Sequence, residues 1–155
     1  MTSRPSHLLN QGFSLMELLI VIAIIAILGV AGFETYRSFS KNVELRSASR
    51  SIAADLRYVQ SKSMTGEGGR RWGAHFVSGD ITYGDHYTLF STTGLATTTI
   101  ATTTLSKGVT FSDPSSGTKD VIFSKISGTT TASTVSIVSE GVTQTVSITA
   151  IGTIN

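Results

Sequence analysis

The sequence contains no cysteine and little charge. Without cysteine it can form neither a disulfide framework nor a thiolate metal site, and the redox compartment stays undetermined by this route. Charged residues make up 14% of the 155 residues, and 12 basic against 10 acidic side chains give a net charge of +2. So small an excess cannot create the electrostatic field of a dedicated nucleic-acid-binding protein. Charge alone therefore points to no partner.

Catalytic motifs are also absent from the sequence. It has no GxSxG nucleophile elbow, no Walker phosphate loop and no HExxH metal pair. The glycine-rich loop from Gly66 to Arg71 lacks the lysine and the serine or threonine that cradle phosphate. A membrane-tethered hydrolase stays an alternative, but no nucleophile, base and orienting group are arranged for it. The sequence predicts a protein that is not an enzyme and needs no cofactor.

Apolar residues account for 40% of the chain, and Ser, Thr and Gly are abundant. A chain of this length allows one domain with one core of ordinary size. The composition favours strands and turns over charged helices. We therefore expect a single soluble part that is mainly β.

Residues 13–33 form an almost unbroken apolar run, whose only strongly polar members are Ser14 and Glu17. About 21 helical residues reach roughly 31 Å, enough to cross the hydrocarbon core of a bilayer. A cleavable secretory signal has a shorter apolar region, of about 7 to 15 residues. A buried helix of a soluble protein would need a second apolar helix beside it, and the sequence offers none. The run predicts a membrane-spanning helix.

A polar leader, residues 1–12, precedes this run and ends at Gly12. The junction GFSLMELLIV, from Gly12 to Val21, resembles the signature of type IV prepilins, in which a leader ending in Gly precedes an aromatic or apolar residue and Glu is the fifth mature residue. The resemblance implies the type IV pilin and type II secretion pseudopilin family. It also implies that a prepilin peptidase cuts between Gly12 and Phe13, and that the new amine of Phe13 is methylated.

Glu17 places a carboxylate within the apolar run, which costs on the order of 2.5 to 3.5 kcal/mol at the bilayer centre. Lying only about one turn inside the run, Glu17 could reach the interface without any further role. The resemblance implies a sharper role, in which Glu17 pairs with the N-terminal amine of a neighbouring subunit during assembly. Two desolvated charges would then compensate one another.

The basic side chains beside the run are Arg37, Lys41, Arg46 and Arg50 after it, and Arg4 before it. Counted alone, these charges favour a cytoplasmic head. The resemblance implies the opposite orientation, with the N-terminus in the cytoplasm, one pass through the bacterial inner membrane, and the head in the periplasm. It also implies later transfer to a filament by an assembly platform.

Residues 34–65 continue without proline, and apolar positions recur at steps of three and four, the period of one helical face. These positions are Val43, Leu45, Ala48, Ile52, Leu56 and Val59. We expect this amphipathic half to lay its stripe on the head and to end near Gly66. Arg46, Arg50, Asp55 and Arg57 are expected on other faces.

Residues 66–155 are predicted to form a β-rich globular head. The segments with strand-like alternation are 72–77, 86–91, 97–105, 109–111, 121–126, 134–139 and 142–149. The last two flank Glu140-Gly141, a hairpin turn. Because short connections cannot make parallel crossovers, we expect a mostly antiparallel sheet against the helix. The predicted fold class is α+β, with a long N-terminal helical spine.

This order of elements, one long helix followed only by β-rich sequence, resembles the GspH/FimT group of minor pseudopilins and pilins. The resemblance implies a position at or near a filament tip. Some FimT-like members bind DNA through arginines near the C-terminus. Here residues 142–155 contain no basic residue and Thr153 follows Gly152. Nucleic acid is therefore a disfavoured partner, though still an open one.

A weak ligand site is suggested by Arg70 and Arg71 beside Trp72. The two guanidinium groups could contact phosphate while the indole stacks on a base. Two charges in a glycine-rich loop more often form a solvated rim, so both interpretations stay open.

Two further patterns in the head have an ordinary explanation. Asp80, Asp85 and His86 carry possible metal donors, but Asp and Gly between strands are common turn residues, and no metal site is expected. Threonine clusters at 97–99, 102–104 and 129–131 could accept sugars, although β-branched threonine also suits exposed strands.

The sequence thus predicts a structural subunit, a minor pilin or pseudopilin of a type IV pilus or a type II secretion pseudopilus. Its expected partners are other subunits, the prepilin peptidase, the inner membrane and the assembly platform. The alternative is a membrane-anchored or filament-tip binding module, for example one that captures DNA in natural transformation.

Overall fold

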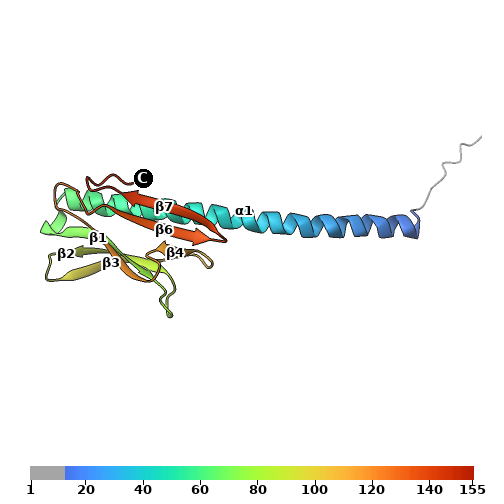
Figure 1. Ribbon diagram of the computed structural model, residues 1–155, viewed down its shortest axis with the longest axis horizontal. Coiled ribbons are helices and arrows are strands. Elements are labelled where there is room, and N and C mark those ends of the chain that lie inside the picture. The colour runs from blue at the N-terminus through green and yellow to red at the C-terminus, as the bar shows by residue number, and fades with distance from the viewer. Residues whose placement is uncertain (1–12) are drawn as a thin grey trace, which may run out of the picture. The chain divides into compact units, whose positions relative to one another are not determined.

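The computed structural model describes residues 13–155, except for the side chains of residues 31, 32, 34 and 35. Its elements are α1 (Leu15–Met64), the 3-10 helix η1 (Glu67–Gly69), β1 (Arg71–Ser78), β2 (His86–Thr92), β3 (Thr97–Thr104), β4 (Thr110–Asp113), β5 (Gly117–Phe123), β6 (Ser133–Ser139) and β7 (Val142–Ile148) (Figure 1). The chain divides into two units between Arg37 and Ser38, so the N-terminal stretch and the head are described separately.

The head is built from two antiparallel sheets. One has the strand order β3-β2-β1-β5, and the other has the order β4-β6-β7. The β6–β7 hairpin turns at Glu140 and Gly141, whose φ angles of 48° and 81° are those of a type I′ turn. Ser139 pairs with Val142 across this turn, which sets the register of the hairpin.

The head part of α1 packs against both sheets and closes a single hydrophobic core. Leu45, Ile52, Leu56 and Val59 lie on one helical face, and each is at most 1% exposed. The rings of the sheets contribute Phe76, Tyr87, Phe111, Phe123 and Trp72 to the same cluster. Steps of three and four in the sequence therefore become one buried face of the helix.

The α+β class, the long N-terminal helix and the antiparallel pairing are confirmed. The seven predicted strands are all present, within a few residues at their ends. The largest error concerns β5, predicted at 121–126 but found at Gly117–Phe123. The strand ends because Ser124 and Gly128 enter a turn closed by Gly128 N donating to the Ser124 carbonyl at 3.0 Å.

Three other expectations needed correction. The strands form two sheets rather than one. Val43, predicted on the buried stripe, is 50% exposed because it lies two residues before the fully buried Leu45, about 200° away around the helix and so on the opposite face. Asp55 and Arg57 lie off the buried stripe, as expected, but each makes a hydrogen bond to the head that was not expected: Tyr87 Oη donates to Asp55 at 2.6 Å, and Arg57 donates to the Ile154 carbonyl at 2.9 Å.

The end of α1 is fixed to the head by polar side chains. Ser63, fully buried, donates its hydroxyl to the Phe123 carbonyl at 2.8 Å. Gln60 Nε2 donates to two carbonyls, those of Gly128 at 3.1 Å and Gly152 at 2.7 Å. The helix ends at Met64, and Gly66 follows with φ 65°, close to the predicted end.

Candidate processing and assembly site

Ser14 forms the N-cap of α1 in the N-terminal stretch. Its hydroxyl accepts a hydrogen bond from the backbone N–H of Glu17 at 3.1 Å, and its carbonyl accepts one from Leu18 N at 3.1 Å. Serine three residues before glutamate is the sequence pattern of a capping box. The cap places the Glu17 carboxylate in the first helical turn, where the helix dipole favours a negative charge. The helix therefore begins one residue after Ser14.

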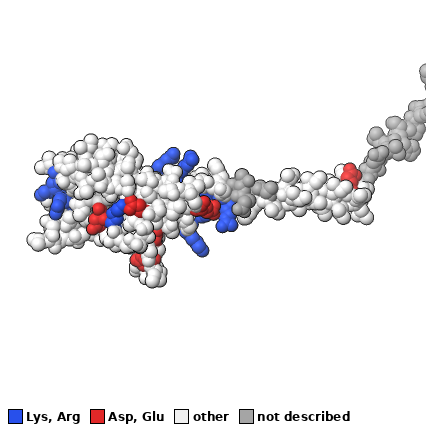
Figure 2. Space-filling model, in the orientation of Figure 1, with Lys and Arg blue, Asp and Glu red and all other residues white. Residues whose placement is uncertain are grey.

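The apolar side chains of this stretch face solvent all around the helix. Every large apolar side chain from Leu15 to Val30 is exposed, with exposed fractions from 42% at Val21 to 88% at Leu15. Figure 2 shows an uncharged surface along the stretch, with one acidic patch near its start. So much apolar surface on a helix indicates a partner that covers it, either lipid or other helices.

Among the residues that the structure describes with their side chains, no helix has both the length and the hydropathy required of a membrane span. The membrane-spanning interpretation of residues 13–33 stays a prediction. Gly12, the predicted last residue of the leader, lies outside the described residues. The cleavage and methylation assigned to Gly12 and Phe13 likewise stay predictions.

Trp72 and the two arginines beside it do not form a common surface. Trp72 is 8% exposed and belongs to the core, so its indole offers no free face for a base. Arg70 donates to Thr98 Oγ1 at 2.8 Å and to Ser91 Oγ at 3.3 Å, which ties the start of β1 to β2 and β3. Arg71 is exposed. The structure thus places Trp72 in the fold, and the ligand contact of the arginines stays a prediction.

Asp80, Asp85 and His86 each make hydrogen bonds within the β1–β2 loop. Asp80 Oδ1 accepts from Thr82 N at 2.7 Å, and Asp85 Oδ1 accepts from Gly79 N at 2.8 Å. The backbone N–H groups of Thr82 and Tyr83, which both donate to Asp80, lower the pKa of its carboxyl below the ordinary value. No group of metal-ligating side chains occurs among the described residues.

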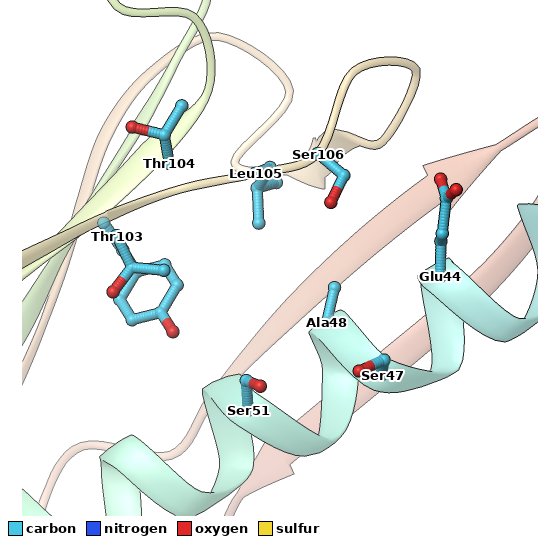
Figure 3. A pocket seen from close by; sticks show the side chains of 9 residues that line it. Glu44, Ser47, Ala48, Ser51, Thr103, Thr104, Leu105 and Ser106 are labelled. Carbon is cyan, nitrogen blue, oxygen red and sulfur yellow. The ribbon is translucent and has the colours of Figure 1, made fainter.

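Two concave surfaces in the head were not found from the sequence. A cavity of about 220 Å³ lies between α1 and the residues at and after the end of β3, with Glu44, Ser51, Leu105 and Ser106 among its lining (Figure 3). Glu44 pairs there with Lys41 at 2.9 Å. The cavity combines hydroxyl groups with one paired carboxylate, a lining without a reactive group.

The second concavity, of about 470 Å³, lies on the outer face of the four-stranded sheet. Thr88, His75 and Asp120 occupy facing positions on β2, β1 and β5, and His75 Nδ1 lies 2.5 Å from Asp120 Oδ1. A hydroxyl, an imidazole and a carboxylate in a row invite comparison with a hydrolase triad. Within the described head, β1 and β2 each pair on both sides, whereas β5, which carries Asp120, is an edge strand of this sheet.

The buried polar contacts of α1 were also missed by sequence reasoning. Asp55 accepts from Tyr87, whose side chain is 1% exposed, and burial with this neighbouring carboxylate raises the pKa of the Tyr87 hydroxyl. The one signal in the sequence was the position of Asp55 beside the apolar stripe, next to Leu56. A carboxylate at the border of a buried face often meets a donor from the facing sheet.

Comparison with known proteins bears on both parts of the chain. Residues 9–33 match the family model of the prokaryotic N-terminal methylation motif. The minor pseudopilin EpsH from the type 2 secretion system of Vibrio cholerae has a similar structure, with a TM-score of 0.53 and 18% sequence identity over 72% of this chain and 94% of that chain. The chain thus carries a prokaryotic N-terminal methylation motif and has a fold similar to that of this minor pseudopilin. No curated protein matches the sequence.

The resemblance stated for the GFSLMELLIV junction is thereby confirmed, because the matched motif includes it. The resemblance of the head to minor pseudopilins is confirmed at the level of the fold.

Proposed function

We propose that this chain is a minor pilin or pseudopilin, a structural subunit that enters a type II secretion pseudopilus or a type IV pilus. The observation that carries the proposal is the N-terminal stretch, which lies within the match to the methylation motif and exposes apolar side chains from Leu15 to Val30 on every side. Such a helix needs either lipid or neighbouring helices around it. A subunit stored in a membrane and then packed into a filament meets both conditions in turn.

Processing creates the group that Glu17 is proposed to bind. Cleavage between Gly12 and Phe13 by a prepilin peptidase gives Phe13 a new amine, which stays cationic after methylation. Within lipid or a filament core, a lone carboxylate and a lone ammonium are both unfavourable, and pairing relieves both. Glu17 of one subunit would therefore select the N-terminus of its neighbour.

The proposed location follows from the same N-terminus. Before assembly, residues 13–33 hold the chain in the bacterial inner membrane, with the leader in the cytoplasm and the head in the periplasm. The assembly platform then transfers the chain to the filament. The proposed activity is assembly rather than catalysis, and it uses no cofactor.

A binding module for DNA receives less support. The indole that would stack on a base is 8% exposed, and residues 142–155 contain no basic side chain. Stacking and phosphate contacts together give single-stranded DNA most of its affinity for a protein. We therefore keep assembly as the proposed function.

Mass spectrometry of the N-terminus tests this proposal. The full chain is co-expressed with a prepilin peptidase, and the expected product begins at Phe13 with a methylated amine. The matched control is Gly12→Ala, which should leave the chain beginning at the leader. A wild-type chain that keeps its leader in the presence of an active peptidase would refute the proposal.

A further inference from the structure

Phe90 forms the floor of the concavity of about 470 Å³ on the outer face of the four-stranded sheet. The side chain is only 7% exposed, yet it does not belong to the hydrophobic core cluster on the other face of the sheet. Phe90 pairs with Gly73 of β1, and a Cβ on Gly73 would lie 3.2 Å from Phe90 Cζ. The ring therefore lies close against the place where Gly73 has no side chain.

Threonine hydroxyl groups dominate the lining of this concavity. The lining comes from all four strands of the sheet, with Thr97 and Thr99 of β3, Thr88, Phe90 and Thr92 of β2, His75 of β1, and Asp120 and Ile122 of β5. Three inter-strand spacings of about 4.8 Å separate β3 from β5, so the surface extends over roughly 14 Å. It is therefore long enough for a short chain of linked rings rather than for a single ion.

The imidazole of His75 is oriented at one end of the concavity by Asp120. These residues face each other on β1 and β5, and His75 Nδ1 lies 2.5 Å from Asp120 Oδ1. In a neutral imidazole whose Nδ1 donates to the carboxylate, Nε2 is a hydrogen-bond acceptor. Neither Nε2 nor Asp120 Oδ2 has a partner among the described residues. The pair thus offers two acceptors to a ligand.

Hydroxyl groups supply donors beside these acceptors. Thr99 Oγ1 has no hydrogen-bond partner in the part of the chain that the structure describes, and Thr88 Oγ1 shares a bond of 3.2 Å with Thr102 Oγ1. A hydroxyl group rotates, so it both donates and accepts. Because the bond of Thr88 goes to Thr102 rather than to His75, the structure shows a binding surface and no activated nucleophile.

The charge of the lining argues against several classes of ligand. Its ionisable residues, His75 and Asp120, pair with each other, and the described lining holds no Lys or Arg. An anionic ligand would meet the Asp120 carboxylate without a compensating cation. A metal ion would find only two side chains of the types that usually bind metals, and no group of three occurs among the described residues. The lining suits an uncharged ligand.

Among uncharged ligands, the hydroxyl-rich lining favours a saccharide over a peptide. An extended peptide joins a sheet at an open edge, where backbone hydrogen bonds hold it. In the middle of this face β1 and β2 each pair on both sides, so the ligand meets side chains alone. A saccharide carries many hydroxyl groups, which match rotating hydroxyls and fixed acceptors. Its C–H groups pack on apolar side chains, here those of Ile122 and Phe90.

We propose that this concavity binds a short neutral saccharide. His75 and Asp120 accept hydrogen bonds from its hydroxyl groups, and the threonine hydroxyls donate to its oxygens. Phe90 and Ile122 support the apolar face of one ring. The inference goes beyond the proposed function, because it gives the head of a structural subunit a ligand of its own on the sheet face that lies away from the core.

Titration with neutral trisaccharides tests the proposal. The full chain, with isotope-labelled threonine methyl groups, is purified in a detergent without a sugar headgroup. Maltotriose, cellotriose and triacetylchitotriose are added in turn up to about 20 mM, and we expect at least one to bind with a Kd of about 1 mM or below. Binding should shift the NMR signals of the Thr88 and Thr99 methyl groups. The signal of Thr145, exposed on β7, should stay in place.

Matched threonine variants locate the binding. Thr88→Val keeps the shape of the side chain but removes the hydroxyl group, which should raise the Kd about fivefold. Thr145→Val is the control, because Thr145 also shares a hydroxyl bond across two strands, with Ser136 Oγ at 2.8 Å. Its Kd should stay within about twofold of wild type. Equal thermal unfolding of the variants excludes misfolding.

Asp120→Asn tests the oriented imidazole. The substitution removes the carboxylate that holds His75 Nδ1, and we expect the Kd to rise about tenfold, since hydrogen bonds to charged groups are the stronger ones. An unchanged Kd in both Asp120→Asn and Thr88→Val would overturn the proposal.

Two further results would overturn it. One is that no trisaccharide binds at about 20 mM, a concentration well above the expected Kd. The other is that a capped glycine–serine tetrapeptide shifts the Thr88 and Thr99 methyl signals while the saccharides do not. These measurements use the purified chain and need no filament, so their failure is distinguishable from failure of the proposed function.

Discussion

The two halves of α1 contain similar apolar residues, but these side chains are exposed in the first half and buried in the second. From Leu15 to Val30, every large apolar side chain is at least 42% exposed, whereas Leu45, Ile52, Leu56 and Val59 are at most 1% exposed. The second half has a β-rich head to pack against, and the described residues of the first half have no such cover. The comparison indicates that the apolar surface of the first half needs a cover from outside the chain, either lipid or other helices.

Two carboxylates of the helix, those of Glu17 and Asp55, repeat this contrast. Asp55 has a partner within its own chain, the hydroxyl of Tyr87 at 2.6 Å. Glu17 lies in the first turn among exposed apolar side chains, where its backbone N–H binds the Ser14 cap. The Asp55 carboxylate therefore bonds within the fold, and the Glu17 carboxylate is the one that we propose to act in assembly.

Replacing one leucine by alanine in each half of α1 tests this contrast most strongly. Leu56→Ala removes a buried side chain, and we expect the free energy of unfolding of the head to fall by about 2 to 5 kcal/mol. Leu19→Ala, in the exposed half, should leave that free energy within about 0.5 kcal/mol of wild type. Urea unfolding of the full chain in detergent measures both. An equal effect of the two substitutions would show that the halves do not differ as described.

Gly73→Ala tests whether the head folds independently of the N-terminal stretch. A Cβ on Gly73 would clash with the carbonyl oxygen of Val121 and would lie 3.2 Å from Phe90 Cζ. Forcing a methyl group into a packed site typically costs about 1 to 3 kcal/mol. Thermal unfolding followed by near-ultraviolet circular dichroism should show this loss, while detergent extraction from membranes stays unchanged. Unchanged unfolding would contradict the tight packing at this position.

Acid stability offers a smaller test, again confined to the head. Asp113, on β4, accepts from Lys119 of β5 and from Thr134 of β6, and these donors lower its pKa below the ordinary value of 3.8. Because the folded pKa lies below the unfolded one, the stabilisation is present above the ordinary pKa. It is lost as the pH falls through the folded pKa.

Asp113→Asn should therefore lower the free energy of unfolding by about 1 kcal/mol at neutral pH, since solvent partly screens the pair. The difference from wild type should be smaller in acid, at a pH below the lowered pKa of Asp113, than at neutral pH, because the carboxylate is then protonated. Urea unfolding at the two pH values measures it. A difference that is the same at both would exclude the proposed contribution of the Asp113 charge.

Sequence reasoning predicted the fold class because its signals are local. The period of the stripe from Leu45 to Val59 gave the buried helical face, and Glu140-Gly141 gave the hairpin turn. The division into two sheets was not predicted, since strand alternation shows which face is buried but not which strands pair. The shift of β5 had a different origin. Its first residues, from Gly117 to Asp120, are largely exposed and polar, so they lack the apolar alternation by which a strand is predicted.

The candidate site was predictable where a motif marks it, at the GFSLMELLIV junction. The Trp72 interpretation failed because proximity in sequence to Arg70 and Arg71 does not reveal that the side chain points into the core. The hydrogen bonds that hold the loop between β1 and β2 were also missed, because the sequence does not show that Asp80 accepts from Thr82 N and Asp85 from Phe111 N.

The contrast between Glu17 and Asp55 gives the most direct test of the account. Glu17→Ala and Asp55→Ala are compared for head stability, membrane insertion and recovery in sheared filaments from the native cells. We predict that Asp55→Ala costs about 1 to 3 kcal/mol, because the buried Tyr87 hydroxyl loses its acceptor. Glu17→Ala should leave head stability and membrane insertion unchanged and remove the chain from filaments. Normal recovery of Glu17→Ala in filaments would contradict the account.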